Sequence, residues 1–176
     1  MIILVIIIQI QRLSNNQSSS NSIFLLGYFN FHGIETSINK EKAFNLFINA
    51  SEKDHILAQY YAGECYLFGL GTKQNEKLAF ECYEKIKNYA MGQKNIGYCY
   101  YNGIGVKKDL KMAFYWYEKA ANNGNMIAMY NLGLFYENGF SVEKDIDNAI
   151  YWYEKSAKQG SQNAQSQLEI LTSKIF

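Results

Sequence analysis

The chain has 176 residues, of which 48% are hydrophobic and 19% charged, and its formal net charge is +1. This length suits one domain or one short array of repeats. Because the chain has neither a basic excess nor a basic stripe, nucleic acid is not an expected partner. The three cysteines (Cys65, Cys82 and Cys99) are odd in number and form no C-x-x-C pair. With only His32 and His55 beside them, we expect reduced thiols, no metal site and no cofactor.

The first ten residues, MIILVIIIQI, are apolar but too few to span a bilayer, which takes about 20 residues. A signal peptide would carry a positive charge ahead of the apolar run, whereas Arg12 follows it. We therefore expect no firm membrane span and a cytoplasmic location. The secretory pathway is the alternative if this segment acts as a signal.

Four glycines mark an internal repeat, with spacings of 36, 34 and 36 residues; these anchor glycines are Gly27, Gly63, Gly97 and Gly133. Another glycine follows each anchor after six residues, an Asn or Asp after twelve, an alanine after sixteen and an aromatic residue after twenty. The four sets are Gly33, Gly69, Gly103 and Gly139; Asn39, Asn75, Asp109 and Asp145; Ala43, Ala79, Ala113 and Ala149; and Phe47, Tyr83, Tyr117 and Tyr153. A period of this length indicates an array of helical repeats.

Each position in the repeat predicts a structural role. The anchor glycine interrupts a helical pattern at a cost of about 1 kcal/mol relative to alanine, which favours close contact with a neighbouring helix. The next glycine ends this helix, helix A, in a left-handed conformation. The Asn or Asp caps the second helix, helix B, and Gly124 and Gly160 end helix B in the last two repeats. The second junction, IKNYAMGQKN, is two residues shorter than the others and predicts a tighter turn.

These positions divide residues 22–161 into four repeats, at about 22–57, 58–91, 92–127 and 128–161. Residues 1–21 are an apolar start and a polar spacer. Their Ile7, Ile8 and Ile10 align with helix B, so a remnant helix of a truncated repeat and a segment without repeat structure are both open. Residues 162–176 are expected to form a C-terminal capping helix, with an apolar stripe at Ala164, Leu168, Leu171 and Ile175.

The third repeat carries the fullest motif: Ile96-Gly97, Tyr100, Gly103, Gly105-Val106, Asp109, Ala113, Trp116-Tyr117, Ala120-Ala121 and Gly124. On this motif, residues 22–165 resemble the Sel-1-like repeat family, a relative of the tetratricopeptide repeat. Ser141 and Glu35 depart from it at the second loop glycine. The resemblance implies an all-α fold, an α/α solenoid (superhelix) of about four helix-turn-helix repeats. It also implies a scaffold or adaptor, or an appendage of a longer chain, in some members one with a kinase domain.

No catalytic residue is predicted. The Gly69-Leu70-Gly71 and Gly103-Ile104-Gly105 segments follow a helix and recur in register, so they are turns rather than phosphate-binding loops. Cys65 and Cys99 occupy the same repeat position, whereas both histidines belong to the first repeat, so no cysteine–histidine pair is indicated.

The candidate site is a concave groove lined by the A helices, as in tetratricopeptide solenoids. The positions one and five residues after the anchor share a helical face, and their residue types vary. They hold Tyr28, Glu64, Tyr98 and Leu134, and then His32, Phe68, Asn102 and Asn138. Such variation suits a surface shaped for one ligand, and equally an unconstrained surface. We expect Tyr28, Phe68 and Tyr98 to be partly exposed and to contact the partner.

The function predicted from these observations is a non-catalytic protein–protein interaction scaffold or adaptor. It would bind a peptide or protein partner in the groove, in signalling or in regulation of a larger complex. One alternative is an interaction or regulatory fragment of a longer protein, for example a kinase-associated one. The other is an enzyme that uses a cysteine thiol.

Overall fold

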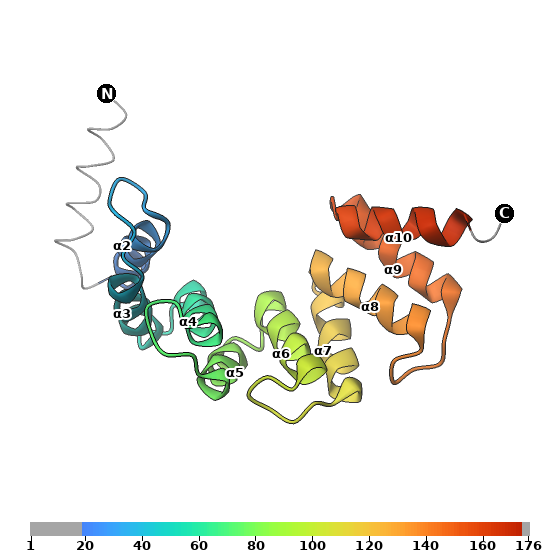
Figure 1. Ribbon diagram of the computed structural model, residues 1–176, viewed down its shortest axis with the longest axis horizontal. Coiled ribbons are helices and arrows are strands. Elements are labelled where there is room, and N and C mark those ends of the chain that lie inside the picture. Colours follow the sequence, from blue (N-terminus) through green and yellow to red (C-terminus); the bar gives the residue numbers. More distant parts are fainter. Residues whose placement is uncertain (1–18, 174–176) are drawn as a thin grey trace. The chain divides into compact units, whose positions relative to one another are not determined.

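Nine α-helices and no strand occur in residues 19–173, which the computed structural model describes (Figure 1). The A helices are α2 (Ser20–His32), α4 (Ile56–Phe68), α6 (Ala90–Asn102) and α8 (Met126–Asn138), and the B helices are α3 (Lys40–Ser51), α5 (Glu76–Lys85), α7 (Leu110–Asn122) and α9 (Ile146–Lys158). Helix α10 (Gln162–Ser173) follows. The predicted all-α helical-repeat fold is confirmed. The predictions for residues 1–18 and for Ile175 lie outside the described residues.

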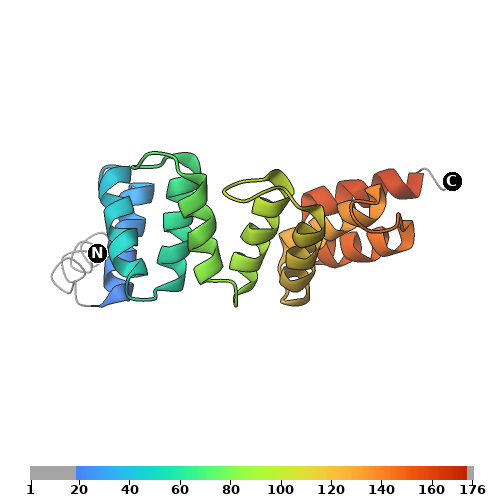
Figure 2. The ribbon, with the colours of Figure 1, turned by 90° about the horizontal axis from the view of Figure 1, so that it is seen from below.

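The chain divides into two units, Met1–Ile86 and Lys87–Phe176. In the first unit, α2 packs on α3, α3 on α4 and α4 on α5, and these four helices stand side by side (Figure 2). In the second unit, each helix from α6 to α10 likewise packs on the next one along the chain. Such consecutive packing is how repeats bury an apolar face that a single helical pair would leave exposed.

The anchor glycines are the places where helix B comes closest to helix A. A Cβ atom built on Gly63 would lie 2.6 Å from the ring of Tyr83, closer than real Cβ contacts come. The same collision would occur at the other three anchors, with the ring twenty residues further on: Gly27 with Phe47, Gly97 with Tyr117 and Gly133 with Tyr153. The predicted close contact is therefore confirmed, and an aromatic ring is what makes it.

Small side chains fill the rest of the contact between the helices. The alanines sixteen residues after the anchors (Ala43, Ala79, Ala113 and Ala149) are fully buried, as predicted. In the first unit the core gathers around Phe47 and Ala62. The second unit has one cluster around Tyr117 and Leu132 and another around Tyr153 and Ala164.

The helix ends follow the predicted signals. At the start of each B helix a side-chain oxygen accepts a hydrogen bond from a backbone N–H; these caps are Asn39, Asn75, Asp109 and Asp145. The A helices end at left-handed glycines with φ between 67° and 78°. Where the second loop glycine is missing, Glu35 and Ser141 adopt φ values of 54° and 58°. Asp54, at φ 57°, takes the place that Gly124 and Gly160 hold in later repeats. The loop path is thus kept without glycine, at a cost of roughly 1–2 kcal/mol per residue.

The predicted tighter turn at the second junction is wrong. The connection from α5 to α6 covers residues 86–89, whereas the connection from α7 to α8 covers only residues 123–125. Helix α5 has 10 residues where the other B helices have 12 or 13. The two missing residues are therefore taken from helix B, because a helix can end a turn early while the connecting turn keeps its length.

Candidate functional site

The eight predicted groove residues project from four A helices, and the two units share them equally. Tyr28, His32, Glu64 and Phe68 belong to the first unit, and Tyr98, Asn102, Leu134 and Asn138 to the second. Within each unit the structure brings these residues into contact with other side chains, and the contacts differ between the two units.

In the first unit, the face shared by α2 and α4 is filled by aromatic side chains that pack on one another. The rings of Tyr28 and His32 are 4.3 Å apart, and Tyr61 of α4 meets Tyr28 edge-on at 5.7 Å. Phe24 contacts Tyr61 at 5.8 Å. Ring pairs at these separations stabilise packing beyond the area they bury. Tyr28 is half-buried. Part of its ring packs on Tyr61 of the next A helix, and the rest is exposed.

Glu64 holds a core side chain in place. Its Oε1 accepts a hydrogen bond of 2.7 Å from the hydroxyl of Tyr83, the ring that lies on the anchor Gly63. In the fourth repeat Glu137 does the same for Tyr153, also at 2.7 Å. A buried hydroxyl needs such an acceptor, so the identity of Glu64 has a structural reason.

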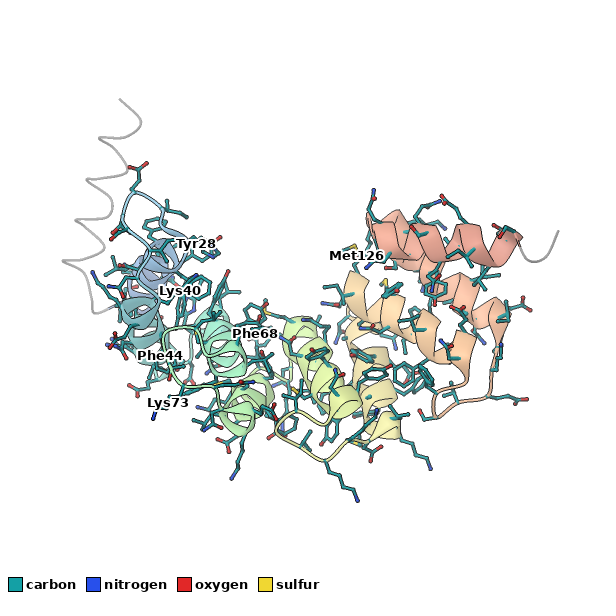
Figure 3. All side chains as sticks on the ribbon, in the orientation of Figure 1. Tyr28, Lys40, Phe44, Phe68, Lys73 and Met126 are labelled. Atoms are coloured by element: carbon teal, nitrogen blue, oxygen red, sulfur yellow. The ribbon has the colours of Figure 1, made fainter. Side chains whose placement is uncertain are left out.

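Phe68 is the most exposed of the predicted aromatic residues, at 59%. It is the last residue of α4, directly before the left-handed Gly69. Tyr28 and Phe68 lie on one side of the first unit, with Lys73 on the opposite side (Figure 3). An exposed phenylalanine at a helix end offers apolar contact area without a polar group to satisfy.

In the second unit, Tyr98 is 40% exposed and lies near the buried Tyr117. Burial, together with the neighbouring Tyr101 and Tyr98, raises the pKa of Tyr117 well above its usual range. Leu134 is half-buried and packs against the cluster that contains Tyr153 and Ala164.

Asn102 and Asn138 end the two A helices of this unit and are exposed. Their Nδ2 groups donate to the carbonyl oxygens of Tyr98 and Leu134, at 3.0 and 2.9 Å. The two asparagines thus make the same hydrogen bond one repeat apart.

Sequence reasoning missed two exposed tyrosines on the B helices, Tyr115 and Tyr151, which are 45% and 47% exposed. Each lies beside a tryptophan, and a lysine ammonium covers both rings; Lys155 lies 4.4 Å from Tyr151. The repeated sequence YWYEK was the available signal. Ile170 of α10, 45% exposed, lies outside the apolar stripe predicted for the capping helix.

Two of the three thiols are poorly suited to nucleophilic chemistry. Burial raises the pKa of Cys65 to about 12 and the pKa of Cys82 to about 11. Since the thiolate is the reactive form, little of it exists near neutral pH. Among the described residues, no group of three or more His, Cys, Asp or Glu side chains could hold a metal ion. Over the same part of the chain, no helix has the length and apolar character needed to cross a membrane.

Paired helices that meet at a glycine and a ring, with capped B helices packed in chain order, define a helical-repeat protein of the α/α-solenoid class. The Sel1 repeat family model matches residues 20–55, 56–86, 90–125 and 127–161. The chain therefore belongs to the Sel1 repeat family. No curated protein matches it. Sel1 repeats generally mediate protein–protein interaction, and the fold is typically a non-catalytic scaffold.

Solved structures with the same fold come from several bacteria. A Sel1 repeat protein from Oxalobacter formigenes is 29% identical, with a TM-score of 0.81 over 85% of this chain and 62% of that one. A protective antigen of uropathogenic Escherichia coli with an SLR fold is 30% identical, with a TM-score of 0.87 over 94% of this chain and 36% of that one. Cysteine-rich protein B of Helicobacter pylori is 26% identical, with a TM-score of 0.61 over 74% of this chain and 98% of that one. This chain thus spans less than two thirds of the first two proteins.

Proposed function

We propose that this chain is a non-catalytic scaffold that binds a protein or peptide partner through exposed aromatic side chains on its A helices. One observation carries the proposal: Phe68 and Tyr98 leave 59% and 40% of their surface exposed at positions whose residue type varies between repeats. The aromatic residues twenty after the anchors, in contrast, are buried in every repeat. Tyrosine and phenylalanine are enriched at protein interfaces, and tyrosine is among the residues that most often dominate the binding energy.

The contacts of the cysteines and histidines support a scaffold over an enzyme. The raised pKa values of Cys65 and Cys82 disfavour the thiolate that a nucleophile requires. His32 packs on Tyr28, and His55 accepts a hydrogen bond from the first turn of α4. Both imidazoles therefore have structural neighbours that account for them.

The finer form of the proposal is a role in signalling or in the regulation of a larger complex. It draws its support from the family, whose repeats mediate contacts between proteins. Purification of the chain under native conditions should then recover it in a complex of more than two proteins. Recovery with a single partner would remove the regulatory part of the proposal and leave the scaffold.

Site-specific photo-crosslinking tests the binding face. A photoreactive phenylalanine analogue is placed singly at Phe68 or Tyr98 on the A helices, and at Tyr115 or Tyr151 on the B helices as matched controls. The four positions are similarly exposed, between 40% and 59%. After irradiation in a lysate of the source cells, mass spectrometry should find a partner crosslinked at Phe68 or Tyr98 and absent at the controls. Crosslinks confined to Tyr115 and Tyr151 would move the binding surface to the B helices and contradict the proposal.

A further inference from the structure

Helix α10 occupies the place of an A helix after the fourth repeat. Leu168 stands 36 residues after Leu132 of α8, and Glu169 stands 36 residues after the anchor Gly133. Helix α10 packs on α9, as α4 packs on α3 and α8 packs on α7 (Figure 1). No further helix follows α10 in the described residues, so within them this A helix has no helix B.

In the complete repeats, helix B finishes the burial of one side of helix A. Directly after α7, the Nδ2 of Asn123 donates to Gln93 of α6 at 2.9 Å. One repeat later, the Nε2 of Gln159 donates to the sulfur of Met129 at 3.4 Å. Both acceptors stand four residues before their anchor glycine. The residues one position before the anchors are buried as well: Leu26, Ala62, Ile96 and Leu132.

The same side of α10 is open. Gln165 is exposed, although Met129 at the same position of α8 is buried. Leu168 is half-buried, whereas Leu132 is fully buried. Together with three residues of α9, these two side chains of α10 line a shallow hollow of about 360 Å³; the three residues are Glu154, Ala157 and Lys158. We call this space the α9–α10 hollow.

The α9 wall of the hollow is open as well. Ala157 is half-buried, whereas Ala121 at the same position of α7 is buried. Ala121 belongs to a cluster against which Trp152 of the next helix B packs. The α9–α10 hollow therefore lies where helix B of a fifth repeat would pack. It differs from the surface that exposes Phe68 and Tyr98, because the α10 positions that line it are buried in every complete repeat.

The sequence near the start of the chain has the residue types of such a helix B. Residues 2–17, which we call the N-terminal segment, align with helix B of the first repeat and the turn after it when shifted by 36 residues. Ile10 then stands at the position of Trp152, and Gln17 stands at the position of Gln159. In the fourth repeat these two side chains cover the preceding helix B and the A helix.

The contact that differs from a complete repeat also fits. Complete repeats bring an aromatic ring onto the anchor glycine, but α10 has Glu169 at this position and the N-terminal segment has Gln11 at the ring position. An amide donates well to a carboxylate, so this pair needs neither a glycine nor a ring. Glu169 also keeps the two helices further apart than a glycine does, because the spacing of packed helices follows the side chains between them. Ile7, which stands at the alanine position, is large enough to fill the wider gap.

We propose that the N-terminal segment of a second copy binds in the α9–α10 hollow as the helix B of the fifth repeat. Ile10 of that copy lies on Ala157, and the amide of Gln17 donates to the side-chain oxygen of Gln165. Helix α2 follows the segment in sequence as helix A follows helix B elsewhere, so the repeat order continues from one copy into the next. This head-to-tail assembly completes a repeat from two halves, and stacked repeats gain stability in this way. It goes beyond the scaffold function and does not depend on it.

Sedimentation velocity of the full chain over a range of concentrations tests the assembly. The parent chain should form species that grow with concentration, because each copy has one segment and one hollow. Leu168→Asp and Ile10→Asp should each weaken association by more than about tenfold, as loss of an interface anchor does. Gln165→Ala should weaken it by about threefold to tenfold, since one hydrogen bond is lost. Ile170→Asp is the matched control and should associate as the parent chain does, because Ile170 is exposed on α10 outside the hollow.

Mixing two variants separates head-to-tail assembly from other kinds of association. Ile10→Asp keeps an intact hollow and Leu168→Asp keeps an intact segment, so each should be monomeric alone at concentrations where the parent chain associates. An equimolar mixture should form a dimer and nothing larger, because only one segment and one hollow remain functional. A mixture that stays monomeric, or that forms species as large as those of the parent chain, would overturn the proposal.

A direct binding measurement covers the case in which Leu168→Asp does not fold. The N-terminal segment, joined to a soluble carrier protein, is titrated onto the immobilised Ile10→Asp chain, and circular dichroism checks the fold of each variant. The carrier should bind this chain. The same carrier with Ile10→Asp in its segment should bind more than about tenfold more weakly. If Leu168→Asp is unfolded, this comparison and Gln165→Ala decide the result.

Other outcomes also overturn the proposal. They are a parent chain that is monomeric at every concentration and does not bind the carrier, a folded Leu168→Asp chain that associates like the parent, and equal loss of association in Ile170→Asp. A monomeric parent chain whose hollow binds the carrier only after Ile10→Asp would place the segment in the hollow of its own chain and overturn the exchange between copies. Crosslinks at Phe68 or Tyr98 in a chain that stays monomeric would leave the scaffold function standing and remove this inference alone.

Discussion

At the scale of single residues, the anchor glycines are required by a contact rather than by their backbone conformation. The glycines with positive φ in the described residues are those that end helices or shape loops, and no anchor glycine is among them. An anchor therefore has ordinary helical geometry, in which alanine would be favoured by about 1 kcal/mol. The neighbouring ring reverses that preference.

Gly133→Ala should destabilise the chain by about 1–3 kcal/mol, because the new methyl group would overlap the ring of Tyr153. Gly27→Ala should cost less, since its Cβ would lie 2.9 Å from Phe47, a longer approach than at Gly133. Urea unfolding followed by circular dichroism measures both. A Gly133→Ala variant as stable as the parent chain would mean that helix propensity outweighs the ring contact.

In two repeats, a glutamate accepts a hydrogen bond from the hydroxyl of the core tyrosine. Tyr83 and Tyr153 each donate to a glutamate of their own repeat, while the first repeat has Phe47 at this position and needs none. In the third repeat, Tyr98 and Tyr101 lie near the hydroxyl of Tyr117 instead. The match explains why one predicted groove position, Glu64, is acidic.

A double-mutant cycle tests whether Glu64 serves Tyr83. Glu64→Leu should destabilise the chain by about 1–3 kcal/mol, since the buried hydroxyl of Tyr83 loses a charged acceptor. Combined with Tyr83→Phe, the same change should cost less than the two single losses added together. Chemical unfolding of the four proteins gives the coupling energy. If the two losses of stability simply add, Glu64 does not interact with Tyr83. Glu64 would then remain a candidate for partner binding.

At the scale of helices and loops, one N-cap depends on the charge of an imidazole. His55 begins α4, and its Nδ1 accepts a hydrogen bond of 3.1 Å from the backbone N–H of Ala58. Asn125 does the same for α8 in the fourth repeat. Protonation of Nδ1 would remove the acceptor, because imidazolium only donates.

Burial lowers the pKa of His55 below its usual value of 6.5. The unfolded chain therefore takes up this proton first, so the stabilisation is complete above pH 6.5 and is lost as the pH falls below it. His55→Asn should keep the cap and stay within about 0.5 kcal/mol of the parent at pH ~7.5. At pH ~5.5 the variant should be the more stable of the two. Thermal unfolding of the parent chain and the variant at the two pH values measures this difference. Stabilities that change in parallel with pH in the two proteins would contradict the prediction.

The loop of one repeat also rests on the helix B of the repeat before it. A Cβ atom on Gly71 would overlap the carbonyl oxygen of Lys40 at the start of α3. In the fourth repeat Ser141 takes this loop position, and its Oγ donates to the carbonyl of Leu110 at the start of α7, at 3.0 Å. Gly71 packs against a backbone carbonyl of the preceding helix B, and Ser141 donates a hydrogen bond to the equivalent carbonyl. This hydrogen bond explains why the fourth repeat accepts a serine at the glycine position.

Gly71→Ala should cost about 2–4 kcal/mol, from the overlap together with the left-handed φ of 75°. Ser141→Ala should cost only about 1 kcal/mol, because it keeps the backbone and loses one hydrogen bond. Denaturant midpoints of the two variants make the comparison. Equal losses would show that the loop moves freely away from the preceding helix.

At the scale of the whole molecule, each of the two units contains an apolar core of its own. The cluster around Phe47 and Ala62 belongs to the first unit, and the clusters around Tyr117 and Tyr153 belong to the second. Helices α6–α10 bury their apolar faces against one another in sequence, and stacking of this kind stabilises an array. The second unit therefore contains a core of its own.

Residues 87–176, expressed alone, should show a helical circular dichroism spectrum and a cooperative thermal transition. The expected cause is the pair of clusters around Tyr117 and Tyr153, which need no residue of the first unit. A fragment carrying Ala113→Leu serves as the control, since an overpacked alanine site should lower its stability by about 1–3 kcal/mol. A disordered fragment would show that the second unit folds only with the first.

The amino-acid sequence by itself determined the helical pairs, the caps and the close approach of a neighbouring helix at each anchor glycine. These features are local, or recur every 34 to 36 residues, so spacing and residue type reveal them. Spacing also identified the A-helix positions at which Phe68 and Tyr98 are exposed. It misjudged the second junction, because a missing pair of residues can shorten either a turn or a helix.

Only the tertiary structure decided which of those side chains already contact other residues of the chain. Tyr28 packs on Tyr61, and Glu64 serves Tyr83, although spacing placed both in the same set as Tyr98. The physical reason is that exposure depends on the side chain that a neighbouring helix presents. In these two pairs that side chain lies 33 and 19 residues away in sequence, and whether it reaches the position depends on how the helices stack.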